Sequence, residues 1–246
     1  MLAVIQDSLR DSIRGEAERV GPFLVRFDAH TDNVFFNYAV PDADATPTAD
    51  DVARLVAAFR ARSRTPRLEY LRPFPAVDAA LAEAGFAVDQ LLPMMAVERA
   101  ALRVPDVPEG VALVDAASDD ELADLTDVQH RAFGVESVTR EVAIERQRAL
   151  LDQGGLLVLA VADGIAVGAG AHTAPQRGLA QVAGIGVLPE YRNRGIAGAI
   201  CGELTARVFA AGLTPFLETE PDGKAGRLYG PIGYRTIGES AAISLR

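Results

Sequence analysis

A short repeat in the sequence is the feature that most constrains the fold. Residues 65–69 read TPRLE and residues 214–218 read TPFLE, and a glycine followed by an aromatic residue comes after each copy, as Gly85-Phe86 and Gly233-Tyr234. Both copies follow the same expected order of helix, strand, helix, Gly-aromatic pair and strand. Units of this kind can resemble one another by chance, but features that recur in register favour a duplicated half-fold.

A connector separates the two copies. The segment RVPDVPEG, residues 103–110, contains two prolines, a glycine and charged residues, which is typical of a linker. The length of 246 residues permits one large domain or two of ordinary size. We therefore predict a first domain over 1–102, a linker over 103–110 and a second domain over 111–246.

Strands alternate with helices in both parts, which predicts an α/β or α+β sheet with helices packed on its faces. Thr48 with Asp51 three places on predicts a helix start, as does Ser118 with Glu121. In the first part we expect helices near 3–19, after Thr48 and near 75–84, and strands near 23–28, 33–40, 67–71 and 86–98. In the second part we expect strands near 111–115, 178–187 and 215–220, a hairpin over 156–173, helices near 119–132, 138–152, 194–211 and 223–230, and a closing pair of strands.

The charge and cysteine content limit the classes of function. The chain has 24 basic and 34 acidic residues and a net charge of −10, which argues against nucleic-acid binding but leaves room for a local loop that holds one small anion. The single Cys201 excludes an internal disulfide and a cysteine cage for a metal, and we expect it to be a small buried apolar residue. His30, His130 and His172 are too scattered for a metal motif, so no metal is expected.

Two segments bear on location. The N-terminal MLAVIQDSLR lacks the basic leading region of a signal peptide, and its apolar run is broken at Gln6-Asp7. The longest apolar stretch, residues 155–171, is interrupted by Asp163-Gly164, a hairpin turn signal. The sequence therefore predicts two buried strands instead of a membrane span, and a cytoplasmic protein.

The most informative stretch, residues 182–201, reads VAGIGVLPEYRNRGIAGAIC, where a strand ends and a helix begins. The first turn of a helix presents N–H groups without internal partners and a partial positive charge. Gly195 lacks a side chain, so the backbone can approach an anion closely, and Arg192 and Arg194 add two cations. This predicts a cradle for a pyrophosphate group, with an ordinary strand-to-helix turn as the alternative. The stretch matches neither the Walker loop nor the dinucleotide-binding glycine motif.

The run from Arg192 to Ala197 resembles the R/Q-x-x-G-x-G/A signature of the GCN5-related N-acetyltransferases, the GNAT superfamily. Residues 186–191, GVLPEY, resemble that family's strand-to-loop approach, and AGRLY at 225–229 with IGY at 232–234 resembles its second motif. The resemblance covers about 111–246. It implies a mixed, mostly antiparallel sheet flanked by helices, and the internal repeat extends this expectation to two tandem GNAT-like parts.

The resemblance also implies a site for acetyl-coenzyme A. Backbone groups at the end of the strand would bind the pantetheine arm, the N–H of Val187 would polarise the thioester carbonyl, and residues 193–198 would hold the pyrophosphate. The candidate cofactor-binding residues are Ile185, Gly186, Val187, Arg192, Asn193, Arg194, Gly195, Ile196, Ala197 and Gly198.

Parts of the chain depart from the family pattern. Asp222 stands where an Asn is typical, and Gly198 stands where a polar or basic residue is common. In the first part, residues 45–51 read ATPTADD before the expected helix, without an R-x-x-G, and Asp50 and Asp51 would repel a phosphate. We therefore predict that the first part is a degenerate GNAT-like half that binds no coenzyme.

Acyl transfer to an amine needs a group that removes a proton and donors that stabilise the oxyanion. The resemblance matches Tyr229 to the tyrosine that protonates the departing thiolate. Glu218, on the expected strand 215–220, is the candidate base, directly or through water. Glu220 shares its parity on the strand and is the rival, and His172 is a further alternative.

These observations predict an acetyl-CoA-dependent N-acetyltransferase that acts on a primary amine. A non-catalytic coenzyme A sensor or scaffold, and an acyltransferase with another acyl donor or a hydroxyl acceptor, stay open as alternatives. The expected partner is a small-molecule or peptide amine, with no nucleic acid and no membrane, and the protein is expected to be a monomer or a homodimer.

Overall fold

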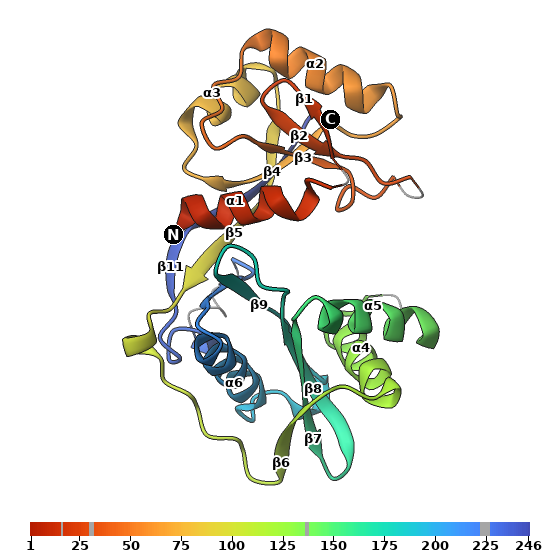
Figure 1. Ribbon diagram of the computed structural model, residues 1–246, viewed down its shortest axis with the longest axis vertical. Helices are drawn as coiled ribbons and strands as arrows, with labels where there is room; N and C mark the ends of the chain where they lie inside the picture. Colours follow the sequence, from red (N-terminus) through yellow and green to blue (C-terminus); the bar gives the residue numbers. More distant parts are fainter. Residues whose placement is uncertain (16, 30–31, 136–137, 222–226) are drawn as a thin grey trace. The chain divides into compact units, whose positions relative to one another are not determined.

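The computed structural model describes residues 1–15, 17–29, 32–135, 138–221 and 227–246, and its contacts divide the chain into two units (Figure 1). The first unit comprises Met1–Met94 with Thr236–Arg246, and the second comprises Met95–Arg235. By contacts, therefore, the connector 103–110 lies inside the second unit, and the end of the chain belongs to the first. Composition marks where a chain turns, whereas strand pairing decides which segments belong together.

The first unit is a sheet in the order β1-β2-β3-β4-β11-β5, with helices on both faces. The β3–β4 pair is parallel, whereas the β1–β2, β2–β3 and β4–β11 pairs are antiparallel. Its strands are β1 (Ala17–Val20), β2 (Phe23–Arg26), β3 (Tyr38–Pro41), β4 (Arg67–Arg72), β5 (Ala87–Ala96) and β11 (Arg235–Ser244), and its helices are α1 (Leu2–Ile13), α2 (Ala49–Arg60) and α3 (Pro75–Glu83).

Two apolar clusters hold the first unit together. Val52, Leu55 and Phe59 of α2 pack with side chains of α3 and of the strands, such as Leu68. On α1, Ile13 packs with residues of β2 and β3. Thr48 and Asp51 form a capping box at the start of α2, as the sequence predicts.

Three sequence predictions in this unit are wrong at particular places. The opening helix ends at Ile13 and not near 19, because Gly15 follows it and residues 17–20 form β1. The strand expected over 33–40 is confined to β3, because the side chain of Asn33 accepts a hydrogen bond from the Phe35 N–H at 3.0 Å and starts a turn. The closing pair of strands is one long strand, β11, which pairs with β4.

The second unit is a sheet in the order β10-β9-β8-β7-β6, in which only the β9–β10 pair is parallel. Its strands are β6 (Val111–Asp115), β7 (Leu156–Ala162), β8 (Ile165–His172), β9 (Leu179–Val187) and β10 (Thr214–Glu218). Its helices are α4 (Asp119–Phe133), α5 (Arg140–Asp152) and α6 (Ile196–Ala210), with short 3-10 turns η1 (Arg99–Ala101) and η2 (Pro189–Tyr191).

The helices of the second unit lie in two layers about this sheet. Helices α4 and α5 cover one face and α6 covers the other (Figure 1). Alternate residues of β7 follow this division: Leu157 and Leu159 pack in the cluster with α4, and Val158 and Ala160 pack in the cluster with α6. The predicted hairpin over 156–173 is confirmed as β7 and β8, with its turn at Asp163-Gly164.

Each unit, taken by itself, is a mixed, mostly antiparallel sheet flanked by helices, as the sequence predicts. The first half of the short helix expected over 223–230, residues 223–226, lies outside the described part of the chain. Within the described residues, no helix is long and apolar enough to cross a membrane.

Candidate active site

The N-terminus of α6 presents backbone amides without a side-chain cap. Asn193 and Gly195 both have left-handed backbone conformations, with φ of +61° and +84°, so the chain turns sharply just before the helix. Gly195 is the N-cap residue and makes no side-chain hydrogen bond, and the first intrahelical bond runs from the Ala199 N–H to the Gly195 carbonyl at 3.1 Å. The N–H groups just before Ala199 are therefore the donors that a helix leaves for an anion.

The two arginines of this loop are engaged with the protein itself. The guanidinium of Arg192 donates from Nε to the Val187 carbonyl at 3.1 Å and from Nη2 to the Ala132 carbonyl at 2.8 Å. Arg194 donates to the Glu190 carbonyl at 3.0 Å and lies over the Tyr191 ring, 5.0 Å from its centroid. Arg192 thus ties the end of β9 to the end of α4, a structural role that the sequence does not indicate.

The ladder between β9 and β10 ends before β9 reaches this loop. The parallel ladder between the two strands runs from Leu179 and Thr214 to Gln181 and Phe216. β9 continues to Val187, so residues 182–187 extend beyond the ladder along an edge that β10 does not cover. Backbone N–H and C=O groups on such an edge can bond an extended ligand, as they would bond another strand.

Tyr229 is half-buried and packs against the cluster under α6. Its ring meets that of Tyr234 edge to face at 6.1 Å between centroids. Burial, with a smaller effect of Cys201, raises the pKa of Tyr229 to about 12, so the hydroxyl keeps its proton at neutral pH. A hydroxyl that keeps its proton is available at this position as a hydrogen-bond donor.

The three candidate bases occupy different settings. Glu218 is the last residue of β10, beyond the parallel ladder and partly buried, and Glu220 follows it and is exposed. His172 ends β8, is 6% exposed, and places Nδ1 3.0 Å from the Thr173 carbonyl oxygen.

Cys201 is buried in α6, and burial raises the pKa of its thiol to about 12. Its burial confirms the expectation of a small apolar residue.

Two features of this region have no clear signal in the sequence. Gln129 of α4 donates from Nε2 to the Gly184 carbonyl at 2.8 Å, in the middle of β9. The connector lies against α6: a Cβ built on Gly198 would be 3.7 Å from Pro105, and one built on Gly202 would be 2.6 Å from it. In the sequence, this packing is reflected in the two glycines spaced four residues apart on the helix. Asp222 and the start of the second motif, residues 225–226, lie outside the described part of the chain.

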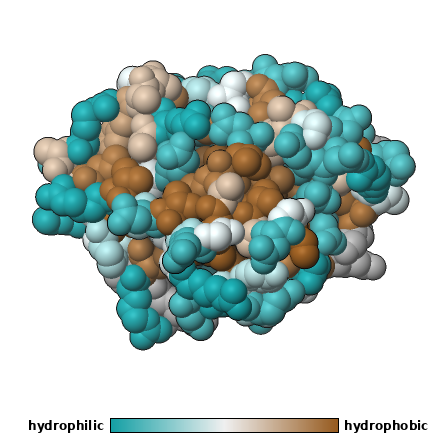
Figure 2. Space-filling model, turned by 90° about the horizontal axis from the view of Figure 1, so that it is seen from below, coloured by the Kyte–Doolittle hydropathy of each residue, from teal (hydrophilic) through white to brown (hydrophobic). Residues whose placement is uncertain are grey.

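The connector also contributes apolar surface to the second unit. Val104 is 50% exposed and Val107 is 44% exposed, although their neighbours pack on α6. Other exposed large apolar side chains of this unit include Phe133, Val135 and Ile165. Figure 2 shows one face of the molecule, on which apolar residues gather in the middle and hydrophilic residues surround them.

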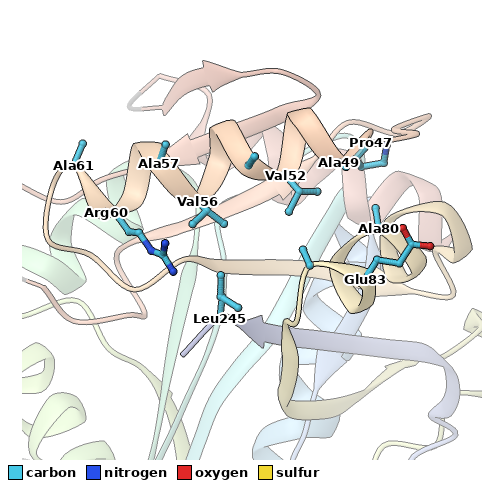
Figure 3. A pocket seen from close by; sticks show the side chains of 12 residues that line it. Pro47, Ala49, Val52, Val56, Ala57, Arg60, Ala61, Ala80, Glu83 and Leu245 are labelled. Atoms are coloured by element: carbon cyan, nitrogen blue, oxygen red, sulfur yellow. The ribbon is translucent and has the colours of Figure 1, made fainter.

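A large hollow lies elsewhere, in the first unit. A groove of about 920 Å³ runs between α2 and α3 and ends at Leu245 (Figure 3). Alanines and valines line most of it, and its charged residues are Arg60 and Glu83. This lining offers no nucleophile and no array of backbone donors, so the groove does not compete with the α6 loop as a candidate active site.

Comparison with solved structures identifies the fold class. The chain is similar to a GCN5-related N-acetyltransferase from Kribbella flavida, with a TM-score of 0.80 and 23% identity over 99% of this chain and 95% of that chain. A tandem GNAT protein from the clavulanic acid biosynthesis pathway gives a TM-score of 0.69 and 13% identity over 91% and 78%. A GCN5-related N-acetyltransferase from Sphaerobacter thermophilus gives 0.67 and 17% over 85% and 71%. The fold is that of the GNAT superfamily.

The family follows from the sequence model that matches the chain. Residues 121–234 match the model of the acetyltransferase (GNAT) family. This segment runs from the first turn of α4 to Tyr234, so the second unit carries an acetyltransferase domain of the GNAT superfamily. No curated protein matches the chain.

Proposed function

We propose that the chain is an acetyl-CoA-dependent N-acetyltransferase whose coenzyme-binding domain is the second unit, Met95–Arg235. One observation supports this most: the uncapped first turn of α6 lies at the end of a strand edge that β10 leaves uncovered. The first turn is suited to a pyrophosphate, and the strand edge is suited to the amide-bearing arm of the coenzyme. Along the chain the strand edge comes first and the first turn of α6 second. The amide-bearing arm and the pyrophosphate follow one another in the same order in the coenzyme.

In this proposal the backbone groups of Ile185, Gly186 and Val187 bind the pantetheine arm. The amides of residues 193–198 hold the pyrophosphate, and Gly195 admits it because a glycine has no side chain there. Arg192 acts mainly through the contacts that it makes with β9 and α4, and Arg194 adds positive charge beside the loop.

The proposed reaction is a direct transfer in a ternary complex. A primary amine gives up a proton to Glu218, directly or through water, and its nitrogen attacks the thioester carbonyl. The Val187 N–H stabilises the oxyanion that forms. The carbon–sulfur bond then breaks, and the departing thiolate takes the proton of Tyr229, which burial keeps protonated. The products are an N-acetylated amine and free coenzyme A.

We propose that the first unit binds no coenzyme, because side chains of its helix α1 already bond the backbone groups of the strands where a coenzyme would bind. By the repeat, β4 corresponds to β10. The side chain of Gln6 in α1 accepts a hydrogen bond from the Leu71 N–H of β4 at 2.6 Å, and Arg10 donates to the Pro41 carbonyl of β3 at 3.4 Å. The parallel ladder between β3 and β4 consists of the pair Ala39 and Leu68. The two strands are therefore no longer paired with each other at the ends where α1 bonds them.

The remaining proposals concern partners and location. The acceptor is a small-molecule or peptide amine, the protein works in the cytoplasm without nucleic acid or membrane, and it is a monomer or a homodimer. Glu220 and His172 remain as alternative bases.

A negative charge introduced in the loop tests coenzyme binding. An aspartate at position 198 suits the first turn of a helix but repels a phosphate, and the nearest atom to a Cβ there, on Pro105, is 3.7 Å away. Calorimetry with coenzyme A should give a Kd at least about tenfold higher for Gly198→Asp, and a change below about threefold for the neutral control Gly198→Asn. Equal affinities for the two variants would contradict the proposed loop.

Release of free thiol from acetyl-CoA, measured against a panel of primary amines, tests catalysis. The enzyme assignment predicts amine-dependent release that Tyr229→Phe and Glu218→Gln lower. Coenzyme binding without turnover on any amine would favour the sensor alternative. Turnover with alcohols or with longer acyl donors would favour the other acyltransferases.

A further inference from the structure

A bulge interrupts β9 in the middle of the proposed coenzyme strand. Ala169 of β8 pairs with Gly186 and Ala171 pairs with Ala183, so Gly184 and Ile185 lie opposite Gly170 alone. Gly184 has a φ of +63°, a conformation that favours glycine. A bulge of this kind bends its strand and changes where the following peptide groups point.

The carbonyl displaced by the bulge finds its partner on α4. Gln129 Nε2 donates to the Gly184 carbonyl oxygen at 2.8 Å. The fit is close, because a Cβ on Gly184 would lie 2.3 Å from Nε2 and a Cβ on Gly186 would lie 2.8 Å from the side chain of Ala132. The helix therefore packs closely on the bulged strand: a side chain at position 186 would meet Ala132, and one at position 184 would displace the amide of Gln129 from the carbonyl.

A second tie joins the same two elements further along. Arg192 bonds both the Ala132 carbonyl at the end of α4 and the Val187 carbonyl at the end of β9. Residues 185–187 thus lie between two points at which polar side chains fix the strand, Gln129 before them and Arg192 after them. These are the residues along which the parallel ladder to β10 has already ended.

We infer that Gln129 is a positioning residue for the coenzyme strand, an inference that rests on the proposed function. By holding the Gly184 carbonyl, it stabilises the bulge and keeps the peptide groups of residues 185–187 turned for a ligand. Gln129 itself touches no reacting atom. Its effect on affinity comes through β9. Without this donor, the Gly184 carbonyl would form a hydrogen bond elsewhere, and the strand would lose its bulged conformation.

Two substitutions separate this role from general packing. Gln129→Met keeps the size of the side chain and removes the donor. The matched control is Gln147→Met, which removes a comparable amide hydrogen bond, from α5 to the Thr126 hydroxyl of α4 at 3.2 Å, with neither partner on β9. Gln129→Glu also lacks the donor and replaces the methionine variant if that variant does not fold.

Calorimetry with coenzyme A and amide hydrogen exchange of residues 185–187 are the readouts. We expect the Kd of the full-length protein for coenzyme A to rise about tenfold or more in Gln129→Met and less than about twofold in Gln147→Met, at similar unfolding temperatures. Amide exchange at 185–187 should become faster only in the Gln129 variants.

Equal weakening by the two methionine variants would overturn the inference, as would exchange at 185–187 that stays unchanged in the Gln129 variants. A wild-type chain that binds no coenzyme A would refute the proposed function instead. The exchange comparison would then still decide whether Gln129 holds the bulge.

Discussion

At the residue scale, the proton on Tyr229 is the feature on which the proposed chemistry depends most. Burial raises its pKa to about 12, so the hydroxyl stays neutral through the physiological range. Its ring packs on Tyr234, and a phenylalanine would keep that contact while it removes the acid. Proton transfer by a positioned group typically contributes about 10²–10⁴-fold to a rate.

We therefore predict that Tyr229→Phe lowers kcat by about 10²-fold or more and leaves the Kd for coenzyme A within about twofold. In the wild type, loss of this proton should not slow the reaction below about pH 11, because the pKa lies at about 12. Steady-state rates over a pH series, with calorimetry on both proteins, check this. Full activity of the phenylalanine variant would remove Tyr229 from the mechanism.

The raised pKa of Tyr229 has a consequence for stability as well. The folded protein holds this proton more tightly than the unfolded chain, whose tyrosine ionises near its ordinary pKa of 10.0. Its contribution to stability is therefore fully present below pH 10 and is lost as the pH rises toward about 12.

At the element scale, the packing of the connector on α6 explains where small residues are needed. Gly202 is buried, and an added Cβ would lie 2.6 Å from Pro105 Cδ and 3.4 Å from the Val104 backbone. A proline ring and a main chain cannot move aside as a flexible side chain can. Gly198 faces the same connector at an ordinary contact distance, so the packing leaves room for a small side chain there.

Gly202→Ala should therefore lower the free energy of unfolding by about 1–3 kcal/mol, because overpacking outweighs the helix propensity that alanine adds. Gly198→Ala is the matched control on the same helix and should be neutral or stabilising by up to about 1 kcal/mol. Urea unfolding of both variants measures the difference. If Gly202→Ala were as stable as Gly198→Ala, the connector would not be packed on α6 as described.

The elements that the sequence predicts well are those that local chemistry defines. The capping boxes at Thr48 and Ser118 mark the starts of α2 and α4, and Asp163-Gly164 marks the β7–β8 turn. The errors occur where the structure of a segment depends on a partner far away in the sequence. Nothing near the end of the chain shows that β11 is one strand, because its partner β4 lies far earlier in the sequence.

At the scale of the whole molecule, the duplication predicts two similar halves with one coenzyme site. Gln6 and Arg10 of α1 already bond the ends of β4 and β3, and Asp50 and Asp51 stand in the first turn of α2, where they repel an anion. Calorimetric titration of the full chain with coenzyme A should therefore give a stoichiometry near one. Hydrogen exchange should show protection by the ligand in residues 182–198 and none in α2.

The control for this prediction is Gly198→Asp, in which the site in the second unit is weakened. If the first unit bound coenzyme, this variant would keep a binding event of wild-type affinity at half the stoichiometry. That outcome would contradict the proposal that α1 bonds the strand ends of the first unit in place of a coenzyme.

The sequence by itself determined the class of fold, the strand–loop–helix at 182–201 and the residue types of the candidate site. These depend on periodicity, capping and glycine conformation, which act between residues near one another in the chain. Only the tertiary structure decided that Arg192 bonds two carbonyls, that Gln129 meets the bulge in β9, and that the last strand joins the first unit. Each of these depends on a partner far away in sequence, and hydrogen bonds at such separations leave no local pattern from which they can be predicted.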